Sequence, residues 1–175
     1  GAEFSANVPD ENVTKDEWYT VGEDGAITYV EGTNPILSIK KKVRAIKRDL
    51  YSGYTNVKVK MSAFTFDALI EHPETLRALG YALRPELYAS AKNDADALKV
   101  GTNAFYGNSH EYIVDFFKKA IDVDELVIDN TIVGIDKLNT STKKFEQKKV
   151  GAFDDGIIML SPTGIIGSIH NVVPL

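Results

Sequence analysis

The clearest pattern of apolar and polar positions runs from Asn34 to Leu79. Apolar residues first recur at helical spacing, which predicts an amphipathic helix with a buried stripe made of Ile36, Ile39, Val43, Ile46 and Leu50. Asn34 is suited to cap this helix, and Pro35 suits its first position because the missing N–H would have no partner there. Gly53 follows the last apolar position and is expected to supply a left-handed terminating residue.

The period then changes from that of a helix to that of a strand. Val57, Val59 and Met61 alternate with lysines, which predicts a half-buried strand. Ser62 is expected to cap a second helix, whose buried side is drawn from Phe64, Phe66, Ala68, Leu69 and Ile70. Pro73 disfavours a helical conformation at the preceding residue, so we expect a break there, followed by a last turn or two over residues 74–79.

The segment before this unit divides into an arm and a hairpin. Residues 1–16 are polar and should form an extended arm that is ordered only when a partner holds it. Residues 18–30 have the composition of two short strands around the turn signal Glu23-Asp24-Gly25. Trp18, the single tryptophan, is more typical of a packing anchor than of a residue that stacks on a ligand.

The segment after this unit contains one further clear helix. Pro85 interrupts residues 80–100, and residues 101–107 are expected to be a flexible segment because a glycine stands at each end. Asn108 or Ser109 can then cap a helix whose apolar face consists of Ile113, Phe116, Phe117, Ala120 and Ile121.

Short strands fill the remainder of the chain. They are predicted at residues 126–128, 131–135, 157–160 and 165–169, and the fully apolar third strand is expected to be central in its sheet. Residues 137–149 form a polar insert with five lysines, which indicates an exposed loop or hairpin. Turns are expected at residues 154–156 and 161–164. Helices and strands alternate without a regular βαβ rhythm, so the pattern favours an α+β fold with a small, mostly antiparallel sheet.

Composition narrows the class of protein. A chain of 175 residues suits one domain, or one domain with a small lobe. Cysteine is absent, which rules out disulfides and thiolate sites, and no apolar run reaches the 18 residues of a candidate membrane span. The net charge of −5 argues mildly against a dedicated nucleic-acid binder.

The charge is unevenly distributed. Six cations fall within nine residues of the first predicted helix, so the remainder of the chain carries −11: they are Lys40, Lys41, Lys42, Arg44, Lys47 and Arg48. One interpretation is a solvated helix face. The other is a face complementary to an acidic strip on a neighbouring subunit, or to nucleic acid.

Candidate chemistry is sparse. The three histidines, His72, His110 and His170, are scattered and do not have the spacing of a metal site. Asp154 and Asp155 precede a glycine between two predicted strands, which is typical of a turn rather than of paired catalytic carboxylates. No nucleophile, zinc-protease or phosphate-loop motif is present. We therefore expect no catalytic residue, no metal and no cofactor.

Two segments in this order resemble the major capsid (coat) proteins of tailed bacteriophages. The first is ILSIKKKVRAIKRDLYSGYTNVKVKMSAFTFDALIEHPETLRAL at residues 36–79, and the second is FDDGIIMLSPTGIIGSIHNVVPL at residues 153–175. Coat proteins of this kind often carry a helix ending in glycine, a strand ending in Met-Ser, and a helix that breaks before Pro-Glu. Their late segment has an acidic turn, an apolar strand and Pro-x-Gly.

The resemblance implies a fold, a function and partners. The fold would be of the Hong Kong 97 type, with residues 1–33 as an arm and short hairpin, 34–79 in the peripheral domain and 80–175 in the axial domain. The chain would be a structural protein of a phage or prophage, not an enzyme. Copies of it would self-assemble into an icosahedral shell around packaged DNA without sequence specificity, with scaffold or portal protein as further partners and no membrane. It would be located in the virion capsid, and in the bacterial cytoplasm during assembly.

The same resemblance leaves specific expectations open to test. Lys40, Arg44, Lys47 and Arg48 are the candidate subunit-contact residues. The long extended loop and spine helix that usually precede this region do not occur in the sequence, which suggests a truncated or processed chain. One alternative is a bacterial nanocompartment shell protein of the same fold. Another is a small ligand-binding or enzymatic domain with a site near Tyr106, His110 and Asp154.

Overall fold

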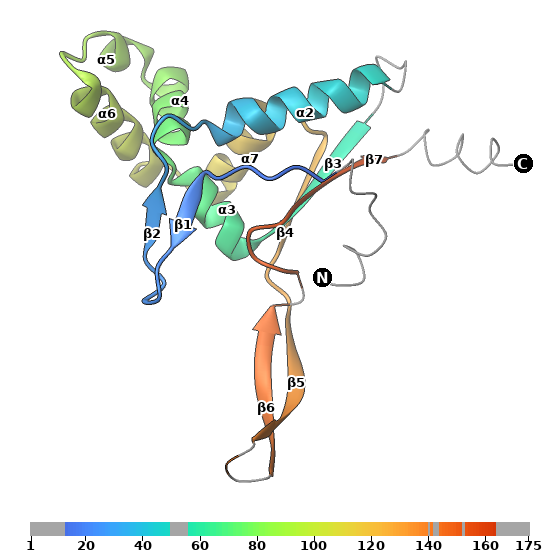
Figure 1. Ribbon diagram of the computed structural model, residues 1–175. Coiled ribbons are helices and arrows are strands. Elements are labelled where there is room, and N and C mark those ends of the chain that lie inside the picture. Colours follow the sequence, from blue (N-terminus) through green and yellow to red (C-terminus); the bar gives the residue numbers. More distant parts are fainter. Residues whose placement is uncertain (1–12, 50–55, 140, 142–143, 152, 164–175) are drawn as a thin grey trace, which may run out of the picture.

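A computed structural model describes residues 13–49, 56–139, 141, 144–151 and 153–163, and it describes only the backbone at 49, 132–139 and 145–151. The described part is an α+β structure with three small sheets. Its helices gather around one three-stranded sheet, while a long hairpin extends away from them (Figure 1). The predicted α+β class is therefore confirmed. Predictions made at residues 1–12, Leu50, Gly53, 164–169 and His170 lie outside the described residues.

The chain begins with the predicted hairpin and continues with the predicted helix. Strands β1 (Tyr19–Val21) and β2 (Ile27–Tyr29) pair in an antiparallel manner. Helix α2 (Pro35–Asp49) starts at the expected proline, and the Leu37 amide donates to the Asn34 side chain at 3.1 Å. Trp18 packs against the hydrophobic core, as predicted for a packing anchor.

Strand β3 (Asn56–Ser62) is the centre of the fold. It lies between β4 (Glu125–Asp129), which runs parallel to it from Lys58↔Glu125, and β7 (Ile158–Thr163), which runs antiparallel from Met61↔Ile158. The small hairpin and the pair β5 (Ile132–Asn139) and β6 (Lys144–Gly151) are antiparallel as well. Three of the four described strand pairs are thus antiparallel, and the β3–β4 pair is the parallel one.

The remaining helices follow β3 in sequence. They are α3 (Ala63–Ile70), α4 (Pro73–Leu83), α5 (Pro85–Ala89), α6 (Asp94–Tyr106) and α7 (His110–Ala120). Ser62 caps α3 and Ser109 caps α7, both as predicted. In Figure 1, α4, α5 and α6 form a group at one end of α2, and α7 lies beneath α2.

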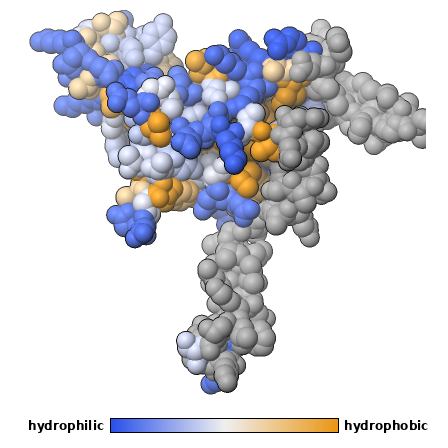
Figure 2. Space-filling view, in the orientation of Figure 1, coloured by the Kyte–Doolittle hydropathy of each residue, from blue (hydrophilic) through white to orange (hydrophobic). Residues whose placement is uncertain are grey.

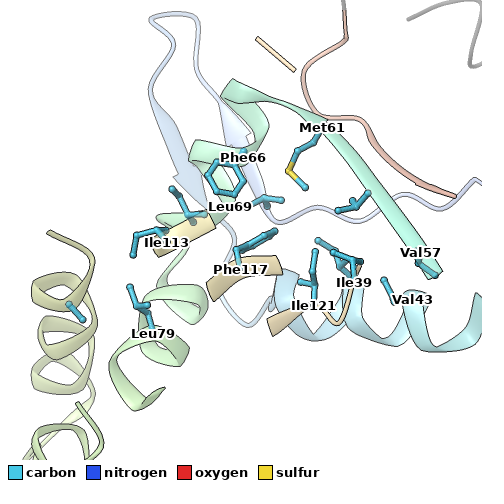
Figure 3. Close-up of a cluster of buried hydrophobic side chains, with 14 residues drawn as sticks. Ile39, Val43, Val57, Met61, Phe66, Leu69, Leu79, Ile113, Phe117 and Ile121 are labelled. Carbon is cyan, nitrogen blue, oxygen red and sulfur yellow. The ribbon is translucent and has the colours of Figure 1, made fainter. Parts of the chain in front are cut away.

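One hydrophobic core joins these elements (Figure 3). Every apolar residue of β3 that alternates with lysine is fully buried. Other large buried side chains come from α2, α3, α4, α7 and the C-cap residue of α7: Ile39, Phe66, Leu69, Leu79, Phe117 and Ile121. The rings of Phe66 and Phe117 meet edge to face, with centroids 5.5 Å apart. Residues 34–79 and residues 80–163 share this core, because β3 and α2 pack with α7.

Two sequence predictions about helices are wrong. The segment after Pro73 is a helix of 11 residues rather than one or two turns, because the proline occupies its first turn and His72 caps it. Residues 101–106 belong to α6 rather than to a flexible segment. Gly101 lies within that helix where α6 meets α4, so it serves close packing rather than flexibility.

The strand at residues 158–163 also differs from the prediction. It is an edge of the three-stranded sheet rather than a central strand, and it continues through Pro162, where a turn was expected. Pro162 lies opposite Val57, whose amide donates to the Asp124 carboxylate at 2.8 Å on the β4 side. A proline has no N–H to give to its neighbour, and an edge strand tolerates that loss.

Candidate functional site

The basic face of helix α2 is the first candidate. We use this name for the six cations at positions 40, 41, 42, 44, 47 and 48, which one helix brings together as predicted. Ile39 and Val43 hold the opposite side of the helix in the core, and both are at most 1% exposed. The only carboxylate within the bounds of α2 is Asp49. In Figure 2, hydrophilic residues occur along the edge of the molecule where α2 runs in Figure 1.

The C-terminal half of the basic face turns toward its own chain. Lys47 Nζ donates to the Asp122 carbonyl oxygen at 2.9 Å and lies 3.7 Å from the carboxylates of both Asp122 and Asp124. Arg44 Nε lies 3.8 Å from the Asp122 carboxylate, although 66% of the Arg44 side chain is exposed. These contacts tie α2 to the connection between α7 and β4, so Lys47 has a role within the subunit.

The N-terminal half of the basic face is only partly neutralised. Lys42 pairs with Asp16 and lies over the ring of Trp18, with Nζ 5.9 Å from the ring centroid. Among the described residues, Lys40 and Lys41 have no ion-pair partner. Of the four candidate contact residues, Arg44 is largely exposed, while Lys40 and Lys47 are half-buried. Arg48 is exposed as well.

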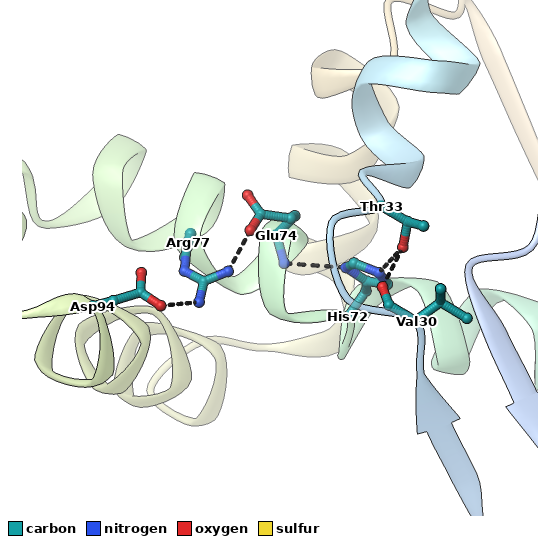
Figure 4. A network of polar contacts seen from close by, with 6 residues as sticks. All are labelled: Val30, Thr33, His72, Glu74, Arg77 and Asp94. Carbon is teal, nitrogen blue, oxygen red and sulfur yellow. Dashed lines mark hydrogen bonds and ion pairs between the residues drawn. The ribbon is translucent and has the colours of Figure 1, made fainter.

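A second candidate is a cavity that the sequence did not indicate. It has a volume of about 580 Å³ and lies between the segment that follows β2 and the start of α4, with further lining from Asp94 of α6. A polar network crosses its wall (Figure 4). Arg77 contacts Glu74 one turn before it and the Asp94 carboxylate, at 2.6 Å, across to α6.

The buried His72 and the half-buried Tyr29 meet in the wall of this cavity. His72 is 2% exposed, and its ring meets the Tyr29 ring edge-on, with centroids 5.1 Å apart. The Tyr29 hydroxyl donates to the Ala68 carbonyl at 2.8 Å, and burial raises the pKa of Tyr29 to about 12. The His-Pro-Glu sequence could have indicated only the capping role of His72, because a proline at the first helical position makes the preceding residue the capping residue.

The residues of the enzymatic alternative are not brought together. Tyr106 is 75% exposed, while His110 and Asp154 are exposed on other elements. His110 contacts Phe66 edge-on, with ring centroids 5.9 Å apart, and no described contact joins it to either of the other two. Within the described ranges, no group of three or more histidine, aspartate or glutamate side chains is placed to hold a metal ion.

The predicted turn at residues 154–156 is confirmed and has a structural role. Ser62 Oγ donates to the Asp155 carboxylate at 2.6 Å, and the Gly156 amide donates to Thr65 Oγ1 at 2.7 Å. Gly156 has φ 78°, a left-handed conformation that glycine adopts readily. The acidic turn therefore holds the start of β7 against the start of α3.

No family model, no curated protein and no solved structure matches the chain. In the part of the chain that the structure describes, no helix has the length and apolar character needed to cross a membrane.

Proposed function

We propose that this protein is a structural subunit that self-assembles into a closed shell, as the major capsid proteins of tailed phages do. The proposal starts from the resemblance of residues 36–79 and 153–175 to such proteins. We also propose that the α+β fold is a capsid fold of the Hong Kong 97 type. Part of a peripheral domain would then lie before residue 80 and an axial domain after it. The structure itself gives the coarser α+β class.

The observation that carries the proposal is the hairpin of β5 and β6. Its strands pair over eight residues each, from Ile132↔Gly151 to Asn139↔Lys144. Figure 1 shows that it extends away from the helices and from the three-stranded sheet. An isolated two-stranded hairpin is at best marginally stable in water. A projecting hairpin of this length is therefore suited to contact another molecule, and neighbouring copies in a shell would provide that contact.

Charge distribution supports a contact between copies. Residues 132–151 contain five lysines, two carboxylates and no arginine, so this hairpin is basic, as is α2. The rest of the chain is correspondingly acidic. Complementary charges of this kind fix register and speed encounter more than they add affinity. We propose that Lys40 and Arg44, together with Arg48, face an acidic strip on a neighbouring copy, while Lys47 supports the helix from within.

Sedimentation velocity tests self-assembly. The protein expressed from its complete gene would be measured over a wide range of concentrations. Shell formation predicts a fast-sedimenting species of uniform size whose share rises with concentration. A single monomeric species at every concentration would contradict the proposal.

A nanocompartment shell is the variant of this proposal with enzyme cargo in place of DNA. Both functions would use the projecting hairpin and the basic helix of this chain for contacts between copies. Neighbouring genes separate them. Portal and terminase genes beside this one support a phage coat protein, whereas a gene for a cargo enzyme supports a nanocompartment.

A further inference from the structure

His72 lies buried at the junction of α3 and α4, and both of its ring nitrogens have partners. It is the N-cap residue of α4, and its Nδ1 accepts a hydrogen bond from the Glu74 amide at 3.1 Å. Its Nε2 lies 3.1 Å from Thr33 Oγ1, in the segment that joins β2 to α2. Figure 4 shows the ring between these two groups. One side chain therefore connects two segments that are 39 residues apart.

The hydrogen bonds around the ring fix its protonation state. Thr33 Oγ1 donates its single proton to the Val30 carbonyl oxygen at 2.7 Å, so toward His72 it acts as an acceptor. The proton in that contact belongs to His72 Nε2. Because Nδ1 accepts from a backbone amide, it carries no proton. Every group in the network is satisfied by one tautomer of the neutral imidazole.

We propose that His72 is an acid-sensitive latch that holds the segment Val30–Thr33 against the start of α4 only while its ring is neutral. A proton on Nδ1 would point at the Glu74 N–H, so the capping hydrogen bond would be lost. It would also place a positive charge at a helix N-terminus, where the aligned peptide dipoles disfavour cations. Release would free the wall of the cavity of about 580 Å³.

Other titratable groups surround the ring on the neighbouring elements. Five of them line the same cavity as His72: Tyr29 and Glu31 from β2 and the segment after it, Glu74 and Arg77 from α4, and Asp94 from α6. Glu71 precedes His72 at the end of α3. Burial lowers the pKa of His72, Glu74 opposes that change, and Arg77 adds to it. Arg77 is held in place by Glu74 and Asp94, so its charge stays near the ring.

The direction of the pH dependence follows from this balance. The closed state binds a proton on His72 more weakly than the open state, in which the histidine has its ordinary pKa near 6.5. The neutral ring therefore stabilises the closed state fully above pH 6.5. This stabilisation is lost as the pH falls from 6.5 to the lower pKa of the closed state. A single proton makes the open fraction rise by at most about tenfold per pH unit.

Nitrogen NMR of the histidine rings tests the proposal on the unaltered protein. Long-range ¹⁵N–¹H correlations at neutral pH should show His72 with its proton on Nε2 and an unprotonated Nδ1. On acidification, His72 should titrate below the ordinary histidine value of about 6.5. A proton on Nδ1 at neutral pH, or titration of His72 at or above that value, would overturn the latch.

A pair of variants tests the consequence for stability. His72→Asn keeps a capping oxygen that does not titrate, and His110→Asn removes an exposed histidine as the control. Urea midpoints would be compared at pH 7.5 and 5.5, where most carboxylates stay ionised. The midpoint of the wild type and of H110N should fall on acidification, and that of H72N should fall clearly less. Equal falls in all three proteins would refute the proposal.

Discussion

Gly101 of α6 lies so close to Leu76 of α4 that a Cβ atom at position 101 would be 1.9 Å from the Leu76 carbonyl oxygen. The reverse contact is also tight, since a Cβ atom on Gly80 would be 2.8 Å from the Gly101 amide nitrogen. The two helices therefore touch backbone to backbone. No side chain fits between them at this crossing, and α6 reaches its position against α4 because both glycines lack one.

Substitution of Gly101 by alanine should destabilise the protein. Alanine gains up to about 1 kcal/mol in helix propensity, but the contact with Leu76 is with backbone and cannot yield easily. Overpacking costs about 1–3 kcal/mol, and a clash with backbone puts this substitution at the upper end, so we expect a net loss of about 2 kcal/mol in urea unfolding. Asn103→Ala on the exposed side of the same helix is the control and should be neutral or slightly stabilising. Unchanged stability of G101A would refute the close crossing.

Two serine caps with different surroundings offer a matched comparison. Ser62 caps α3 by accepting from the Thr65 amide at 3.2 Å, is 4% exposed, and also donates to Asp155. Ser109 caps α7 in an exposed position. We expect Ser109→Ala to cost about 1 kcal/mol and Ser62→Ala about 2 kcal/mol, because the latter leaves a buried amide without a partner. Chemical denaturation measures both, and equal losses would contradict a role for Ser62 in holding the acidic turn.

Lys47 and Lys41 belong to the same basic face but should respond differently to neutralisation. Lys47→Met removes the contacts with Asp122 and Asp124, and we expect a loss of about 1 kcal/mol because water can replace part of the interaction. Lys41→Met should change the free energy of unfolding by less than about 0.5 kcal/mol. Thermal or urea unfolding of the two variants checks this difference. A larger loss of unfolding free energy for K41M than for K47M would contradict the contacts assigned to Lys47.

Charge reversal tests the contact proposed for the basic face. The variant K40E/R44E/R48E should remain folded by circular dichroism but fail to form shells, because like charges would then meet the acidic strip of the neighbouring copy. The matched control is K15E/K92E/K99E, which reverses three exposed lysines elsewhere and lowers the net charge equally. The control should still assemble. Normal shells from the first variant would show that assembly does not need the basic face.

The sequence pattern correctly predicted features that depend on residues close together in the chain. The caps at Asn34, Ser62 and Ser109 and the buried alternation in β3 all follow from residues within a few positions of one another. The cluster of cations on α2 was equally visible. The pattern could not show that Lys47 contacts its own chain, because its partner Asp122 is 75 residues away in the sequence.

Two of the wrong predictions have a shared physical origin. Gly101 and Pro162 are residues that usually break regular structure, so residues 101–107 were predicted to be flexible and a strand was ended too early. In the fold, Gly101 is needed where two helices touch, and Pro162 lies on an edge strand where a missing amide is tolerated. Both structural roles depend on a neighbouring element that is distant in sequence. The His72 network was missed for the same reason, since Thr33 is contributed by another segment.

Electron microscopy of the protein expressed from its complete gene tests the central proposal most directly. Shell assembly predicts closed particles of uniform diameter, with walls built from copies of this chain. Fields that contain only monomers or irregular aggregates, from protein that is folded by circular dichroism, would contradict it.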